Sequence, residues 1–445
     1  MLLFVINILF LLALLILGAP LPFAFGGAFI IMILFGDLPV NSIILWGFNQ
    51  IISPTLLAVP LFILFGAIVK ESGIAERLLR FANLFIGKIK GSIGAVVIVT
   101  SSFLGAISGS SFTGIASVGQ IMIPRMEKQG YTNGYSTALV SVSSVLGSLI
   151  PPSVIMIIYG WTTGTSVLGS FLSTLGPGIL LIILFTIIHF VHSNKYFATK
   201  GIYKEAVDEI DPDSNVKFKF LGEANSKTRI VISAIPSLLL PVIILGGIYG
   251  GYFTPTEAAA IASVLGLFLG IAIYREMKFR NFTSLMKDSS SSIGSIMAMI
   301  FFSLLLAQTY VHMQIPQTIV GFFADITDSK VVILIIVTIF LIFVGMIVND
   351  TTAIILTAPL LLPLVVSYGI DPIHFAAIMG VNLAMGGITP PYASVLYFGM
   401  RVGNAKFSEV WRPTTMFIIF GYIPVILVTV FFEPLSMFIP RLFGY

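Results

Sequence analysis

Runs of predominantly apolar residues recur along almost the entire chain, and most are long enough to cross a ~30 Å hydrocarbon layer as a helix. Of the 445 residues, 57% are hydrophobic and only 9% are charged, whereas a soluble domain carries about 25% charged residues. Because lipid offers no hydrogen-bond partners, backbone that crosses a bilayer must satisfy its own polar groups. Membrane barrels do so with alternating segments of about 10 residues, a pattern this sequence lacks. The sequence therefore predicts an all-α polytopic protein embedded in the lipid bilayer.

Charge in the connecting stretches sets the expected orientation of these segments. We expect membrane segments at residues 2–18, 21–36, 51–69, 91–108, 112–129, 135–160, 177–193, 229–247, 256–273, 289–311, 331–348, 350–367, 373–400 and 413–432. Lysines and arginines gather in a few loops, which the positive-inside rule places in the cytoplasm. The net charge of +4 resides in these short loops, so it gives no sign of nucleic acid as a partner.

A polar insert at 194–228 divides the chain into two halves, and we read it as a cytoplasmic linker. The first half, 1–193, is expected to contain scaffold helices over 1–90, a hairpin and a broken helix over 91–160, and a connecting helix over 161–193. The second half, 229–445, is expected to contain scaffold helices over 229–330, a hairpin and a broken helix over 331–400, and a last helix at 413–432. Residues 72–90 are amphipathic, which is typical of a helix lying in the membrane interface.

The two halves share an internal repeat. A shift of 239 positions lays residues 105–160 on residues 344–399 without a gap. The matches fall on residues that dictate backbone shape: Pro124 with Pro363, Gly130 with Gly369, Gly147 with Gly386, Pro151–Pro152 with Pro390–Pro391, and Gly160 with Gly399. Shared prolines and glycines at weak overall identity indicate duplicated structure.

The two copies begin on opposite sides of the membrane. Segments 91–108 and 112–129 leave from and return to the basic side, whereas 331–348 and 350–367 leave from and return to the acidic side. This predicts an inverted-topology repeat, an architecture of many secondary transporters. The charge pattern alone leaves open whether each pair crosses the membrane fully or turns back midway. In either case, the paired prolines should interrupt helices 135–160 and 373–400 and free backbone carbonyls for ions.

The turns of the two hairpins carry the polar residues. They read "GAISGSSFTG" at 105–114 and "GMIVNDTTAI" at 345–354. Either Ser110 or Ser111, and either Asn349 or Asp350, is expected to cap the returning helix. An inward helix N-terminus suits an anionic group, and the C-terminus of the preceding helix suits a cation. Close packing of small residues remains an alternative for the serines, and a purely structural cap remains one for Asp350.

Several function classes find no support in the sequence. There is no cysteine, P-loop, zinc motif, GxSxG motif or acid pair. We therefore expect neither ATP hydrolysis nor a bound cofactor. An intramembrane enzyme using Asp350 would need a second buried acid or a nucleophile–base pair. A passive channel would show flux that does not depend on sodium.

Over essentially its full length the chain resembles the large membrane subunit (DctM type) of tripartite ATP-independent periplasmic (TRAP) transporters. The likeness rests on "GAISGSSFTGIASVG", "IPPS", "YFTPTEAAA", "NDTTAIILTAPLLLPL" and "GGITPPYASVLYFG". It implies a sodium-driven importer of small organic anions in the bacterial inner membrane, working by an elevator mechanism with two re-entrant hairpins. It also implies two partners, a small four-helix membrane subunit and a periplasmic substrate-binding protein. A stand-alone sodium–carboxylate symporter of similar fold is the alternative.

The resemblance also implies site residues. One sodium site would use Ser108, Ser110, Gly147, Ile150 and Pro152, several through backbone carbonyls. The counterpart in the second repeat would use Ile347, Asn349, Gly386, Thr389 and Pro391. Substrate contacts would come from Ser111, Thr113, Asp350, Thr351 and Thr352. The identity of the anion stays open among C4-dicarboxylates, sialic acids, keto acids and sugar acids.

Overall fold

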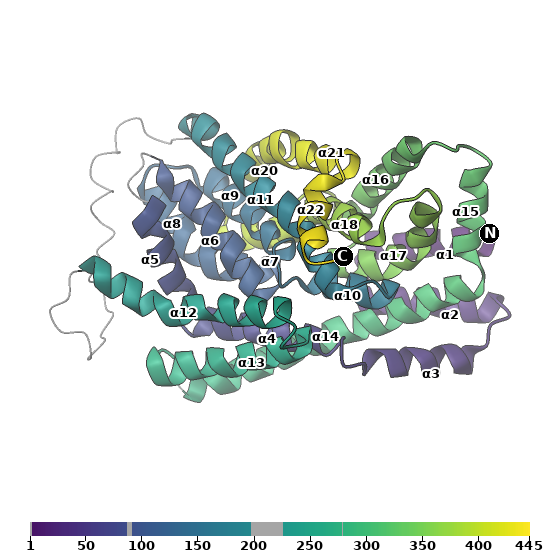
Figure 1. The fold of residues 1–445 in the computed structure, drawn as a ribbon, viewed down its shortest axis with the longest axis horizontal. Helices are drawn as coiled ribbons and strands as arrows, with labels where there is room; N and C mark the ends of the chain where they lie inside the picture. The colour runs from purple at the N-terminus through teal and green to yellow at the C-terminus, as the bar shows by residue number, and fades with distance from the viewer. Residues whose placement is uncertain (1, 87–90, 197–225, 278) are drawn as a thin grey trace.

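The computed structural model describes residues 2–86, 91–196, 226–277 and 279–445, and its regular elements are helices (Figure 1). The helices before the predicted linker are α1 Leu2–Ile16, α2 Leu21–Phe35, α3 Val40–Ile51, α4 Ala58–Glu71, α5 Ile74–Ile86, α6 Ser92–Ser108, α7 Ser111–Gly114, α8 Gln120–Lys128, α9 Asn133–Ser144, α10 Val154–Thr163 and α11 Val167–His192. Those after it are α12 Ser226–Tyr249, α13 Pro255–Phe268, α14 Phe279–His312, α15 Ile315–Ala324, α16 Lys330–Ile347, α17 Asp350–Ser367, α18 Pro372–Gly386, α19 Ser394–Gly403, α20 Phe407–Phe417, α21 Ile423–Phe431 and α22 Pro434–Leu442. The predicted linker 194–228 falls mostly on 197–225, outside the described residues.

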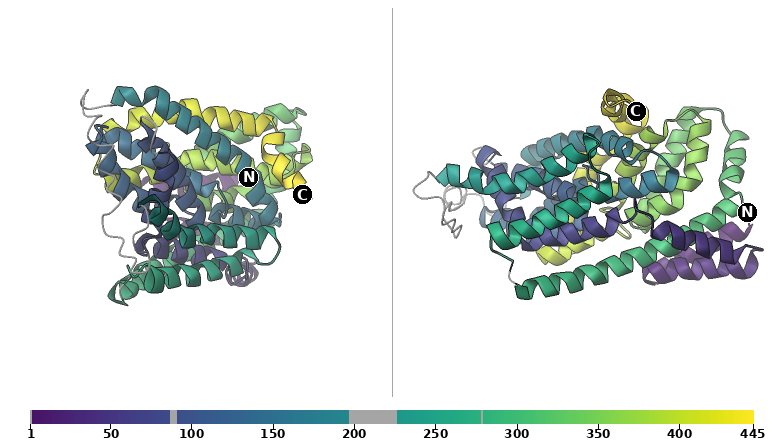
Figure 2. Two further views of the ribbon diagram at one scale, coloured as in Figure 1. Left: turned by 60° about the vertical axis from the view of Figure 1, so that its left-hand side comes forward. Right: turned by 60° about the horizontal axis from the view of Figure 1, so that its bottom comes forward.

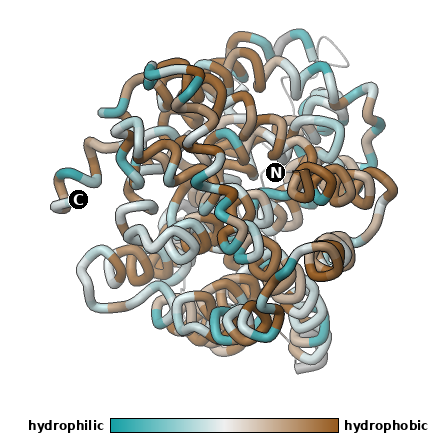
Figure 3. Tube along the Cα trace, turned by 90° about the vertical axis from the view of Figure 1, so that its right-hand side faces the viewer, coloured by the Kyte–Doolittle hydropathy of each residue, from teal (hydrophilic) through white to brown (hydrophobic). Residues whose placement is uncertain are grey.

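Within the described ranges, 7 helices are long and apolar enough to cross a membrane, or up to 8 if α4 and part of α5 form one bent span. Hydrophobic residues make up much of the helical path, as the brown stretches of the trace show (Figure 3). The prediction of an all-α polytopic membrane protein is therefore confirmed. In the predicted segments 112–129 and 413–432, a π-helical turn joins two α-helices into one continuous helix. These turns are Ile115–Gly119 between α7 and α8, and Ile418–Tyr422 between α20 and α21.

Three helices were not predicted: α3, α15 and α22. They contain 12, 10 and 9 residues, which is too short for a spanning segment. A search for long apolar runs therefore passes over them. The predicted amphipathic helix at 72–90 is present as α5, and it turns by 70° from the preceding α4.

Each half contains one hairpin and one interrupted helix. Hairpin 1 is α6 followed by α7–α8, and hairpin 2 is α16 followed by α17. In the first interrupted helix, α9 continues as a 3₁₀ turn and ends before Pro151–Pro152, after which α10 begins. In the second, α18 ends before Pro390–Pro391 and α19 follows. Both Pro–Pro peptide bonds are cis.

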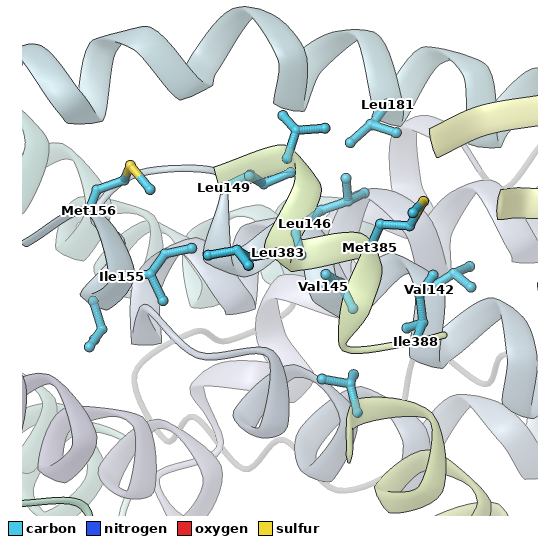
Figure 4. Packing of buried hydrophobic residues seen from close by; sticks show 14 of the residues in the cluster. Val142, Val145, Leu146, Leu149, Ile155, Met156, Leu181, Leu383, Met385 and Ile388 are labelled. Carbon is cyan, nitrogen blue, oxygen red and sulfur yellow. The ribbon is translucent and has the colours of Figure 1, made fainter. Parts of the chain in front are cut away.

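The interrupted helices form the centre of the core. The break between α9 and α10 packs against α18, with Leu149, Met156 and Leu383 among the buried side chains there (Figure 4). Hairpin 1 packs on α9 through α6, and hairpin 2 packs on α18 through α16. Outside this centre, the long α14 lies beside α2 and α3 along one edge of the molecule (Figure 2, right). The hairpins are thus held against interrupted helices buried inside the protein.

Candidate functional site

The tip of hairpin 1 turns through a left-handed glycine. Helix α6 ends at Ser108, Gly109 has φ +63°, and α7 begins at Ser111. The Ser108 hydroxyl donates to the Leu104 carbonyl at 2.9 Å and lies 3.3 Å from the Gly105 and Ser110 carbonyls. This side chain therefore faces back into the end of its own helix, where carbonyl oxygens gather.

The prediction that Ser110 or Ser111 caps the returning helix is wrong. Ser110 occupies the N-cap position, but its side chain accepts no hydrogen bond from the helix. The Ser111 hydroxyl is buried and finds no hydrogen-bond partner in the part of the chain that the structure describes. Buried polar groups are normally paired, so the start of α7 retains hydrogen-bonding capacity that the described residues do not fill.

The tip of hairpin 2 is built differently. Val348 joins the two helices in an extended conformation, and Asn349 caps α17 by accepting the Thr352 amide at 2.8 Å. The Asp350 carboxylate accepts the Thr351 amide at 2.8 Å and is half-buried. Of the two predicted caps at this tip, Asn349 is therefore the one that the structure uses.

Glycines allow each hairpin to touch its interrupted helix backbone to backbone. A Cβ on Gly105 would overlap the Cα of Gly147, and a Cβ on Gly386 would overlap the backbone of Gly345. The first pair joins α6 to the break after α9, and the second joins α16 to the end of α18. Gly147 and Gly386 differ by 239 positions, but Gly105 and Gly345 differ by 240. The gapless alignment is therefore wrong by one residue at the hairpin glycine.

The break after α9 leaves a carbonyl without its helical donor. In a continuous helix the Gly147 carbonyl would accept from residue 151, but Pro151 has no N–H. The Ile150 amide is directed to the Leu146 carbonyl at 2.9 Å instead. The Ser153 hydroxyl closes the loop by donating to the Ser148 carbonyl. The tip of hairpin 1 meets this break, because a Cβ on Gly109 would lie 3.1 Å from the Pro152 carbonyl.

The break after α18 is more nearly closed by its own backbone. The Gly386 carbonyl accepts the Thr389 amide at 3.0 Å, and the Thr389 hydroxyl donates to the Met385 carbonyl at 2.7 Å. The Tyr392 amide, just after the prolines, donates to the Met346 carbonyl of hairpin 2 at 2.9 Å. This hydrogen bond ties the second tip directly to the second break.

The structure thus brings each predicted set of sodium ligands to one junction between a hairpin tip and a break. Junction 1 contains Ser108, Ser110, Gly147, Ile150 and Pro152. Junction 2 contains Ile347, Asn349, Gly386, Thr389 and Pro391. Carbonyl and hydroxyl oxygens are ligands that suit a hard cation. The Gly147 carbonyl lacks its helical donor, and the Ile150 amide is directed to Leu146, so junction 1 is the one that fits an added cation better.

The predicted substrate residues are split between the two tips. Ser111 and Thr113 lie on hairpin 1, and Asp350, Thr351 and Thr352 lie on hairpin 2. Thr113 lies against Gly66 of α4, and the Thr352 hydroxyl is 3.0 Å from the Met299 sulfur of α14. Both threonines therefore contact helices outside the hairpins.

Sequence reasoning missed Met299 and Gly66, since neither lies in a polar motif. The Asn349 side-chain amide also contacts the Met299 sulfur, at 3.4 Å. Separately, an apolar cavity of about 160 Å³ lies between α5, α6 and α12, lined by Leu78, Phe81, Ala82, Val99, Thr100, Phe103 and Leu238. It contains none of the predicted site residues, and its apolar lining does not suit an ion.

Comparison with known proteins adds the decisive observation. The family model of the DctM component of tripartite ATP-independent periplasmic transporters matches residues 8–434. The chain belongs to this DctM family. It is 33% identical over 395 residues to the sialic acid TRAP transporter large permease protein SiaM of Vibrio cholerae, covering 88% of this chain and 87% of that protein. It is also 33% identical over 414 residues to the C4-dicarboxylate TRAP transporter large permease protein DctM of Pseudomonas aeruginosa, covering 93% and 92%.

The DctM fold is similar to that of a solved transporter. The structure of MtrF from Neisseria gonorrhoeae, described as an efflux pump, matches with a TM-score of 0.61 at 14% identity, over 90% of this chain and 86% of that one. At this identity the likeness concerns the fold alone. The DctM relatives are permeases rather than enzymes, which supports transport over an intramembrane enzyme. This DctM-type large subunit is a multi-pass protein of the bacterial inner membrane.

Proposed function

We propose that this chain is the membrane-spanning unit of a sodium-coupled importer of a small organic anion. The observation that carries the proposal is the pair of junctions at which a hairpin tip meets an interrupted helix. Discontinuous helices of this kind supply ion and substrate sites in secondary transporters. One sodium ion binds at each junction, through the ten residues named above, and no other cofactor is required.

The anion binds between the two tips, through Ser111 and Thr113 on one side and Asp350, Thr351 and Thr352 on the other. The N-terminus of α7 supports this placement, because its amides lack a side-chain cap and a helix N-terminus attracts negative charge. The named relatives include transporters for sialic acid and for C4-dicarboxylates, both of which carry carboxylates. A carboxylate is therefore the substrate class that we propose.

Transport proceeds by an elevator movement in inverted repeats. The hairpins and interrupted helices, which pack on one another, move as one body against the outer helices, and each hairpin turns back within the membrane. A periplasmic binding protein delivers the anion, and a small four-helix membrane subunit completes the complex. Membership of a tripartite family supports both partners.

Ion gradients supply enough free energy for this cycle. Each sodium ion that enters down ~100 mV contributes ~2.3 kcal/mol, and a tenfold concentration gradient adds ~1.4 kcal/mol. After the cost of bringing in one monovalent anion, two ions leave about 5 kcal/mol. That is ample for accumulation of about a hundredfold or more without nucleotide.

Uptake into liposomes tests the proposal. The chain is reconstituted with its small membrane subunit and its periplasmic binding protein, and labelled sialic acid, C4-dicarboxylates and sugar acids are offered. We expect accumulation of one of them only with an inward sodium gradient and only with the binding protein present. Accumulation without the binding protein would favour a stand-alone sodium–carboxylate symporter, and equal flux in potassium would refute sodium coupling.

A further inference from the structure

The two short helices that lead into the hairpins are attached to the rest of the molecule in different ways. Helix α5 precedes hairpin 1 and α15 precedes hairpin 2, and each follows a sharp turn at a residue with positive φ: Gly73 at +73° and Gln314 at +56°. They occupy matching places in the two halves. We call them arm 1, residues 74–86, and arm 2, residues 315–324.

A buried guanidinium fastens arm 1 to the outer helices. Arg77 is 4% exposed, and its Nη1 lies 2.8 Å from the Glu276 carboxylate and donates to the Gly73 carbonyl at 2.8 Å. The guanidinium carbon lies 3.7 Å from the centre of the Tyr274 ring. One side chain of arm 1 therefore holds the turn before the arm and also the segment that follows α13.

Tyr274 carries the attachment further, to α12. Its hydroxyl lies 2.6 Å from the Ser237 hydroxyl and donates to the Ser233 carbonyl at 3.2 Å. The ion pair also covers Gly73, because a Cβ at that glycine would collide with Arg77 and Glu276. Burial of a paired, stacked and hydrogen-bonded arginine demands defined geometry from all its partners.

Arm 2 has no equivalent of this attachment. Its sequence, IPQTIVGFFA, contains no charged residue. It packs mainly on α17, a helix of hairpin 2, and its buried Ile315 shares an apolar cluster with α1, α2 and α14, whereas arm 1 packs on both α12 and α6. In Figure 1, arm 2 stands at one end of the molecule, while arm 1 lies among α6, α8 and α12 at the other.

We propose that Arg77 is a positioning residue that makes arm 1 part of the stationary outer helices, through a polar attachment that arm 2 lacks. This inference rests on the proposed elevator movement. Its consequence is an asymmetric transporter. Hairpin 1 slides against an arm that Arg77 fixes, whereas apolar packing alone holds the arm beside hairpin 2.

Hydrogen–deuterium exchange on the purified full-length chain tests the attachment directly. Amides in residues 74–82 should exchange at least about tenfold more slowly than those in 315–324. Arg77→Met should raise exchange in 74–82 toward the rate of arm 2. Arg77→Lys should give a smaller rise than Arg77→Met, because lysine keeps the positive charge. The rise should not be zero, because an ammonium cannot reproduce the stacked fork of arginine. Lys70→Met is the matched control, since Lys70 is an exposed cation before the same turn, and exchange should not change.

Uptake by the reconstituted complex adds a readout that lost stability alone would not give. Arg77→Lys should lower the maximal rate roughly tenfold while leaving the half-saturating sodium and substrate concentrations unchanged, because Arg77 is not at either junction. Equal exchange in the two arms of the wild type, or unchanged exchange in folded Arg77→Met, would overturn the inference. If Arg77→Met does not fold, the absence of any rise in Arg77→Lys overturns it instead. Uptake that does not depend on sodium would refute the proposed function, but it would not contradict the exchange result.

Discussion

The two hairpin tips occupy equivalent places in the repeat but satisfy their backbone in different ways. Tip 2 caps itself, with Asn349 on the Thr352 amide and Asp350 on the Thr351 amide. Tip 1 has serines at the corresponding places, and none of them caps α7. The junctions behind the tips differ in the same sense, because the Gly386 carbonyl accepts the Thr389 amide, whereas the matching Ile150 amide is directed to the Leu146 carbonyl and not to Gly147. Within the described residues, junction 1 therefore leaves more of its hydrogen-bonding capacity unfilled than junction 2 does.

The largest expected effect comes from adding a methyl group where hairpin and break touch. Gly105→Ala and Gly147→Ala should be equally severe, since each Cβ meets the other glycine's Cα. Overpacking of this kind costs about 1–3 kcal/mol or more, and uptake should be lost. In the second repeat Gly345→Ala should be milder than Gly386→Ala, because its Cβ lies 3.2 Å from the Gly386 Cα.

Gly246→Ala serves as the control for this series, since nothing lies within 4 Å of its Cβ position. The measurements are the melting temperature of the purified chain and the rate of uptake. Wild-type stability and uptake in Gly147→Ala would show that the backbones do not meet there.

The next effect separates the junctions by their response to sodium. Ser110→Ala should raise the sodium concentration for half-maximal uptake roughly tenfold, since a hydroxyl near a charged group contributes about 1.5–3 kcal/mol. Thr389→Ala should raise it less, because the Thr389 hydroxyl is already directed to the Met385 carbonyl. Unchanged sodium dependence in both variants would refute the assignment of the two sites.

A smaller effect distinguishes the caps. Asn349→Ala should destabilise the chain by about 1 kcal/mol, the usual cost of losing an N-cap. Ser110→Ala should leave stability in sodium-free buffer unchanged, because Ser110 makes no cap. Melting temperatures in choline chloride give the comparison, and an equal loss in both variants would contradict the asymmetry of the tips.

The smallest expected effect concerns the contact between tip 2 and α14. Met299→Leu removes the sulfur that lies near Asn349 and Thr352 while conserving volume. Such exchanges usually cost less than about 1.5 kcal/mol. The rate of uptake should fall less than about threefold, and its dependence on sodium should be unchanged. A tenfold change in the half-saturating sodium concentration would place Met299 closer to the ion than we propose.

The sequence was sufficient for features set by proline, glycine and long apolar runs. It predicted the membrane class, the positions of both hairpins and the two interruptions at Pro151–Pro152 and Pro390–Pro391. These features follow from missing amide donors and from the length needed to cross lipid, which are local properties.

Features that depend on tertiary contacts were missed or misassigned. The one-residue difference at Gly105 and Gly345 accompanies a left-handed Gly109 in one tip and an extended Val348 in the other. Ser110 does not cap α7 although its residue type favours capping, because a cap depends on the local geometry as well as on the residue. Short helices such as α15 also lack the length that marks a spanning segment.

The most direct test of the central claim is a high-resolution cryo-electron microscopy map of the whole complex in sodium chloride, compared with one in choline chloride. We predict a density peak at each junction in sodium, in contact with the Gly147 carbonyl at the first and with Thr389 at the second. In choline both peaks should vanish, and tip 1 should lose more order than tip 2. Identical maps in the two salts, with no peak at either junction, would contradict the account.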